Sequence, residues 1–162
     1  MLFRSAHFHA FAEASQSPTS VEKKFRFQLG HDIVTGFLDR LDERAGEAVI
    51  IDYKTSLVRD QKEADKDARE SQQLALYALA YREVAGRLPD RVELHFLTPG
   101  GVVIGQALKR EKELERAADR VQTASRGIRA GVFQATPSQW VCDFCAFRTI
   151  CPATAWTGER QG

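Results

Sequence analysis

The chain has 162 residues, of which 43% are hydrophobic and 28% are charged. This length and composition suit a compact protein with a core of its own, and there is no internal repeat or low-complexity stretch. The formal net charge of +1 does not by itself identify a nucleic-acid binder, so any basic surface must be local. No apolar run approaches the roughly 20 residues of a membrane helix, and no signal-peptide pattern opens the chain. We therefore expect a cytoplasmic protein that does not associate with membranes.

The first third of the chain is predicted to contain one helix and three strands. Leu2–Ala14 is predicted to be a helix. Apolar and polar residues alternate over 24–29, which is typical of a half-buried strand. Residues 32–42 and Val49–Lys54 predict a second and a third strand, joined by a turn at 45–47. Because the third strand begins with three apolar residues in a row, we expect it at the centre of a sheet covered by helices.

The remainder alternates between helices and strands. Residues 57–69 are dense in charge and predict a mobile loop, while Glu70–Val84 predicts a helix. Arg91–Leu97 alternates as a strand and is followed by a Pro-Gly-Gly turn, and Lys109–Arg129 predicts a long amphipathic helix. A tail from Thr136 onward holds the cysteines and both tryptophans. The order helix, three strands, helix, strand, helix predicts an α/β fold with helices around a mixed sheet.

Two carboxylates and a lysine are predicted to meet at one end of this sheet. Asp52 and Lys54 lie two apart on a strand and therefore share a face, and a short turn brings Asp39 of the preceding strand beside Asp52. We expect the two carboxylates within about 5 Å of each other, as a hard-oxygen site suited to Mg²⁺ or Mn²⁺. A metal there polarises a phosphate and makes a bound water more acidic, while Lys54 orients that water or stabilises charge on phosphorus. Taken alone, the same residues also fit a surface ion pair and a turn cap.

Three short motifs follow one another in the chain: Gly36-x-x-Asp39, Asp52-Tyr53-Lys54 and Gln73-x-x-x-Tyr77. The last pair shares a helix face, and in isolation it is equally compatible with a surface glutamine and a core tyrosine. In this order the set resembles the motifs of RecB-like nucleases of the PD-(D/E)XK type, from about residue 22 to residue 152. That family includes the nuclease domains of AddAB and RecBCD and the CRISPR-adaptation nucleases that carry an iron–sulfur cluster.

The resemblance implies a restriction-endonuclease-like core, a central mixed β-sheet flanked by helices. It implies a magnesium-dependent deoxyribonuclease, with an exonuclease preferred over an endonuclease, serving as the nuclease domain of a helicase–nuclease in DNA repair and recombination. The roles it implies are metal ligation by Asp39, Asp52 and the backbone carbonyl of Tyr53, catalysis by Lys54, and support of the site or DNA contact by Gln73 and Tyr77. The family also places a metal-binding histidine on a helix before the strands, for which His7 and His9 are the candidates; a surface histidine is the alternative.

The three cysteines follow the spacing Cys142-x-x-Cys145, five residues, then Cys151-Pro152. An odd, clustered set favours a zinc or iron–sulfur site over disulfides, although three packed reduced thiols remain an alternative. RecB-like cluster nucleases end with the same arrangement, which implies a [4Fe–4S] cluster whose fourth cysteine lies far upstream. Because this chain has no fourth cysteine, we expect it to be a fragment that lacks its natural N-terminal segment. We divide it into a nuclease core at 1–135 and an iron–sulfur tail at 136–162.

Four basic residues of the predicted long helix fall in one arc opposite its apolar stripe: Lys109, Lys112, Arg116 and Arg120. This arc is a candidate for binding DNA phosphates, although interleaved acidic residues also fit a salt-bridged solvent face. No helix suited to sequence-specific groove contacts is evident, which fits single strands or DNA ends as the substrate. No P-loop motif is present, so a helicase motor would be another domain or subunit. The alternative function is a non-catalytic DNA-binding module with a degenerate or truncated nuclease fold.

Overall fold

The computed structural model describes residues 18–158. The expected N-terminal helix, with His7 and His9, lies outside the described residues. The chain divides into two compact units, Met1–Ala124 and Ser125–Gly162, which are described separately below. No helix within residues 18–158 is long and apolar enough to cross a bilayer.

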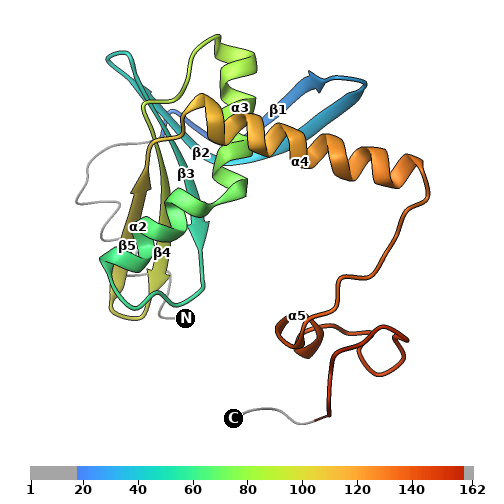
Figure 1. The fold of residues 1–162 in the computed structure, drawn as a ribbon. Helices are drawn as coiled ribbons and strands as arrows, with labels where there is room; N and C mark the ends of the chain where they lie inside the picture. Colours follow the sequence, from blue (N-terminus) through green and yellow to red (C-terminus); the bar gives the residue numbers. More distant parts are fainter. Residues whose placement is uncertain (1–17, 159–162) are drawn as a thin grey trace. The chain divides into compact units, whose positions relative to one another are not determined.

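The first unit is built on one mixed sheet whose five strands lie in chain order (Figure 1). The strands are β1 (Ser20–Leu29), β2 (Asp32–Arg44), β3 (Glu47–Lys54), β4 (Arg91–Thr98) and β5 (Gly101–Ala107). Only β3 and β4 pair in parallel; the other neighbours are antiparallel. The parallel pair needs a long crossover, which two helices provide. This architecture confirms the predicted α/β fold with a mixed sheet and flanking helices.

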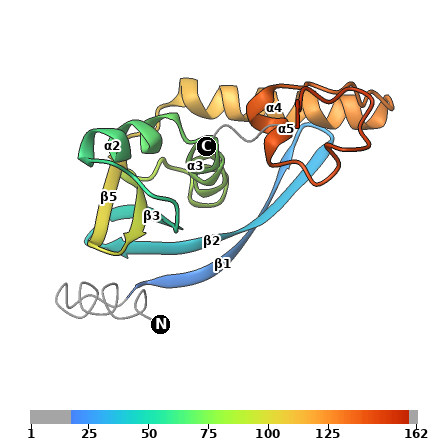
Figure 2. The ribbon, with the colours of Figure 1, turned by 90° about the horizontal axis from the view of Figure 1, so that it is seen from below.

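The crossover helices α2 (Gln61–Glu70) and α3 (Gln72–Ala85) lie on the same face of the sheet (Figure 2). The hydroxyl of Ser71 accepts from the amide of Leu74 and caps the start of α3, while Gly86 ends the helix in the left-handed conformation. Leu74 is fully buried, and it shares the core with apolar residues of β3 and β4 such as Ile50 and Val92. The core therefore fixes the start of α3 against the centre of the sheet.

The prediction of a mobile loop over residues 57–69 was wrong, because α2 occupies most of this segment. Asp60 caps the helix by accepting from the amide of Glu63 at 2.8 Å, a signal that was present in the sequence. Only two alanines of the helix, Ala64 and Ala68, are buried. Such a narrow apolar contact suffices because Gly105 of β5 lets the helix backbone come close: a Cβ there would lie 2.1 Å from the carbonyl oxygen of Ala64.

The strand β5 was not predicted, because the pattern after β4 indicated only a turn. The turn consists of Pro99 and Gly100, and the hydroxyl of Thr98 donates to the carbonyl oxygen of Gly101 at 2.8 Å, which closes it. The helix α4 (Glu111–Arg129) lies within two residues of its predicted start and ends where predicted. In the second unit the short helix α5 (Gln139–Asp143) is followed by turns.

Candidate active site

The hairpin of β2 and β3 brings Asp39 to the end of β3. The strands pair Arg40 with Ile51, so one further step of the same register places Asp39 opposite Asp52. The carboxylate of Asp39 accepts a hydrogen bond from the backbone amide of Tyr53 at 3.1 Å. Asp39 is therefore held beside the peptide unit that follows Asp52, while the expected separation of about 5 Å between the two carboxylates stays a prediction.

Asp52 is a buried carboxylate without full hydrogen bonding. The residue is 1% exposed, and its Oδ2 has no hydrogen-bond partner of good geometry among residues 18–158. The ammonium of Lys54 lies 2.5 Å from this oxygen as an ion pair. Burial raises the pKa of Asp52 and the charge of Asp39 raises it further, while Lys54 lowers it. A desolvated carboxylate of this kind is stabilised by a bound cation.

Lys54, the ion-pair partner of Asp52, is the first member of a hydrogen-bonded series that continues through Gln73 to Tyr77. The Nζ of Lys54 donates to the Oε1 of Gln73 at 2.7 Å, and the Nε2 of Gln73 donates to the hydroxyl of Tyr77 at 2.9 Å. Burial raises the pKa of Tyr77; the hydrogen bond from Gln73 opposes this shift, and the charges of Asp52 and Asp39 add to it. The helix α3 thus links both of its motif residues to Lys54, the ion-pair partner of Asp52.

Gly36 of β2 supports this series of hydrogen bonds indirectly, which explains its place in the first motif. A Cβ at Gly36 would lie 2.5 Å from the ring of Phe25, so the absence of a side chain leaves room for that ring. The ring of Phe25 in turn contacts Tyr77 edge to face, with centroids 6.0 Å apart. Sequence reasoning missed Phe25, because a buried aromatic residue on a strand carries no signal beyond its alternation.

The side chain of Tyr53 contacts a cluster of polar residues on β4, which sequence reasoning also missed. Its ring meets the ring of His95 edge to face, with ring centroids 5.7 Å apart. His95 bonds Glu93 at 2.8 Å, and Glu93 also accepts from the guanidinium of Arg91 at 2.7 Å. The alternation of polar residues along β4 was the available signal. These contacts hold Tyr53, between Asp52 and Lys54 in the chain, at its side chain as well as its amide.

The donor set of the first unit fits a hard divalent cation. No group of three or more His, Cys, Asp or Glu side chains within residues 18–158 is arranged to hold a metal. The residues that would hold one are Asp39 and Asp52, with the backbone carbonyl of Tyr53. Mg²⁺ commonly binds through one or two carboxylates and keeps several waters, so this oxygen set suits it. Within residues 18–158 the buried Oδ2 of Asp52 is ion-paired with Lys54 but accepts no hydrogen bond, so such an ion would add a second positive charge beside this oxygen.

The cysteines of the second unit do not gather into a metal site in the described residues. All three are free. Cys142 is buried, and its Sγ accepts from the amide of Ala155 at 3.3 Å, which lowers its pKa. Cys145 and Cys151 are partly exposed. The iron–sulfur site therefore stays a prediction.

Of the four basic residues singled out on the long helix, Lys109 has a different environment from the others. It is 4% exposed, and its ammonium donates to the carbonyl oxygens of Arg69 at 2.6 Å and Ser71 at 3.1 Å. Because these bonds occupy its ammonium inside the protein, Lys109 ties the α2–α3 junction to the start of α4 rather than offering a free charge to solvent. Lys112, Arg116 and Arg120 are exposed on α4.

The mixed five-stranded sheet with its flanking helices defines a restriction-endonuclease-like fold. The model of the PD-(D/E)XK nuclease superfamily matches residues 2–152, and the chain therefore belongs to this superfamily, whose members are typically metal-dependent nucleases. Among solved structures, the chain is similar in fold to the protein described as "Crystal structure of SSO0001", with a TM-score of 0.52 and 19% identity. That match covers 91% of this chain and 68% of the other. No curated protein sequence matches significantly.

Proposed function

We propose that this chain is the catalytic core of a metal-dependent deoxyribonuclease of the RecB-like group. It uses Mg²⁺ or Mn²⁺ and acts on single strands or DNA ends, as an exonuclease rather than an endonuclease. It serves as the nuclease domain of a helicase–nuclease in DNA repair and recombination. The observation that carries the proposal is the continuous contact from Asp52 through Lys54 and Gln73 to Tyr77, with Asp39 held at the adjoining amide.

The acidic residues and the lysine have different roles, because their side chains differ in exposure. A divalent cation bound by Asp39 and Asp52 would supply Lewis-acid polarisation of the phosphate and a more acidic attacking water. Asp52 is buried, whereas the side chain of Lys54 is 32% exposed, so the lysine is the member of the pair that reaches the substrate. Its ammonium stabilises the negative charge that builds on phosphorus as the new P–O bond forms and the bond to the leaving oxygen breaks.

Gln73 and Tyr77 position Lys54. Gln73 accepts one of the three ammonium protons, and Asp52 lies beside the same group, which leaves donor capacity for a phosphate oxygen. The hydroxyl of Tyr77 holds the amide of Gln73 in the orientation that presents its oxygen to the lysine. The two α3 residues therefore fix the direction of the ammonium before the substrate arrives.

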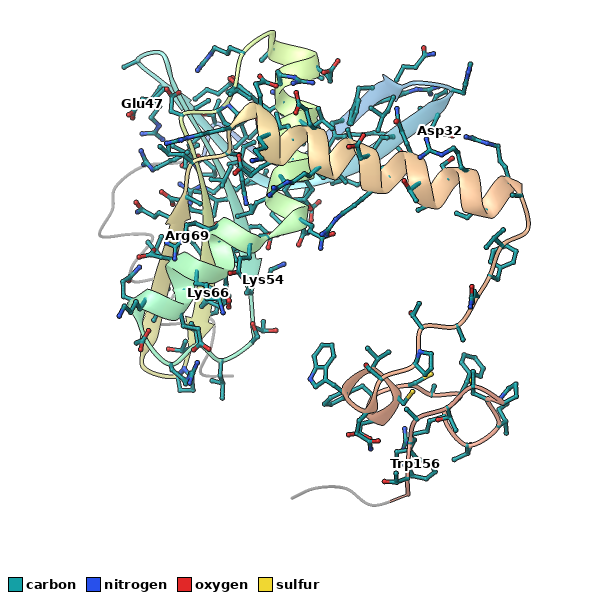
Figure 3. The ribbon with its side chains drawn as sticks, in the orientation of Figure 1. Asp32, Glu47, Lys54, Lys66, Arg69 and Trp156 are labelled. Carbon is teal, nitrogen blue, oxygen red and sulfur yellow. The ribbon has the colours of Figure 1, made fainter. Side chains whose placement is uncertain are left out.

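The experiment that tests the proposal is cleavage of end-labelled single-stranded DNA by Lys54→Ala, with Mg²⁺ or Mn²⁺ present. We expect kcat to fall by about 10²–10³, because one preorganised charge on the transition state is lost, while DNA binding stays nearly intact. Lys66→Ala, which removes an exposed lysine of α2, is the matched control (Figure 3). Cleavage by Lys54→Ala at the wild-type rate would remove Lys54 from the mechanism. DNA binding without cleavage by the wild-type chain would favour the non-catalytic module.

For the tail we propose that Cys142, Cys145 and Cys151 are three of the ligands of an iron–sulfur cluster. Nuclease chemistry needs no electron transfer, so the cluster's work is structural, closing a long loop between distant parts of the chain. Anaerobically prepared protein should be brown and contain iron. Stoichiometric zinc without iron would contradict this assignment.

A further inference from the structure

A groove of about 350 Å³ lies in the first unit, between the α2–α3 junction and the first half of α4. Four basic residues line it: Arg69, Lys109, Arg116 and Arg120. Two glutamates also line it, so the lining carries a net positive charge. A concave surface with this charge is suited to a polyanion.

The cations of the groove are not neutralised by ion pairs. Arg69, Arg116 and Arg120 are exposed, and none of them forms an ion pair with another residue between 18 and 158. At the floor, the ammonium of Lys109 donates to two carbonyl oxygens; burial lowers its pKa, and the charge of Glu113 opposes this shift. Glu113 accepts from the backbone amide of Arg110, and its charge also attracts Lys109 and Arg116. The groove keeps a net positive charge because four basic side chains line it against two acidic ones.

The start of α3 adds backbone donors to the same groove. Ser71 and Gln72 line it, and the capping hydroxyl of Ser71 is used by Leu74. The amide N–H of Gln72 has no acceptor among residues 18–158. The positive end of a helix and a free amide favour a negatively charged group at this point, in addition to the arginines.

The groove and the candidate active site involve neighbouring residues of α3. Gln72 lines the groove, and Gln73 is the acceptor of Lys54. Figure 3 shows Arg69 near the end of α2, which leads into α3, and Lys54 at the end of β3. We propose that the groove binds the sugar–phosphate backbone of the substrate strand next to the phosphate being cleaved. The assignment of that strand as substrate rests on the proposed function.

The test is the affinity for a fluorescein-labelled oligothymidylate, measured by fluorescence anisotropy in EDTA. Arg116→Gln and Arg120→Gln should each weaken binding by roughly tenfold, since each loses a charge-assisted contact to phosphate. Each should also reduce the slope of log K against log salt by about 0.7, the value for one contact with a single strand. Lys112→Gln is the control, because it removes the same charge from the same helix outside the groove.

Binding of both arginine variants at wild-type affinity would overturn the groove assignment, and so would an equal loss in Lys112→Gln. In cleavage assays the arginine variants should raise KM and leave kcat unchanged, because they remove binding that is uniform along the reaction. Since the anisotropy measurement contains no metal, it does not depend on catalysis. DNA bound through the groove but never cleaved would contradict the proposed function alone, and normal cleavage with a neutralised groove would contradict the groove alone.

Discussion

Replacing Asp52 by asparagine should stabilise the metal-free protein and abolish its response to divalent metal. The carboxylate is 1% exposed, and its Oδ2 lacks a hydrogen bond of good geometry within the described part of the chain. Burial raises its folded-state pKa above the unfolded value. Between these two pKa values the folded state binds more protons, so stability decreases as pH rises through the folded pKa. Asparagine removes this cost, and the gain should be greater at neutral than at acidic pH.

With metal present, the wild-type chain should gain stability from metal binding, whereas the Asp52→Asn variant should not. A ligand at about 100 times its Kd stabilises the folded state by roughly 2.7 kcal/mol. For a chain of 162 residues this corresponds to a rise in Tm of roughly 5–10 °C. Differential scanning fluorimetry with and without Mn²⁺ measures both effects. Asp119→Asn, which alters an exposed carboxylate of α4, is the control and should behave as wild type.

An equal Mn²⁺-induced rise in Asp52→Asn and wild type would show that the ion binds elsewhere. A metal-free variant that is less stable than wild type at neutral pH would show that the contact between Asp52 and Lys54 outweighs the cost of burial. Either result would refute the reasoning.

Two further changes test the positioning of the site. Gln73→Leu should lower kcat with little change in KM, because Lys54 loses its acceptor while the fold is kept; steady-state kinetics on labelled DNA measure this, and an unchanged kcat would exclude a positioning role. Gly105→Ala should destabilise the protein by about 1–3 kcal/mol or more, because its Cβ would meet the backbone of Ala64. Thermal unfolding checks the second change, for which Gly100→Ala is the control: its φ is not positive, and an added Cβ would lie no closer than 3.9 Å to another atom.

The parts of the fold that the sequence predicted are those with a strong local pattern. Alternation identified β1 and β4, and the apolar stripe identified α4 almost to its ends. The helix α2 was missed because it buries only Ala64 and Ala68. Its contact with the sheet depends on Gly105, which lies 41 residues after Ala64 in the chain. Such a contact exists only in three dimensions, so no local pattern reveals it.

The candidate site shows the same division. Spacing alone placed Asp52 and Lys54 on one strand face and Gln73 and Tyr77 on one helix face, and the structure links them through hydrogen bonds. Spacing did not reveal the support from His95, because a histidine on a strand has many possible partners until the neighbouring strand is known. Nor did it show that Lys109 is buried, since charge patterning cannot separate a solvated lysine from one bonded to carbonyl oxygens.

The central claim is that Asp39, Asp52 and Lys54 form a metal-dependent nuclease site. The most direct measurement is cleavage of end-labelled single-stranded DNA by the wild-type chain and by Asp52→Asn, each with Mg²⁺ or Mn²⁺ and with EDTA. We expect cleavage by the wild type only when metal is present, and none by the variant under either condition. Cleavage that persists in EDTA, or that Asp52→Asn performs at the wild-type rate, would contradict the claim.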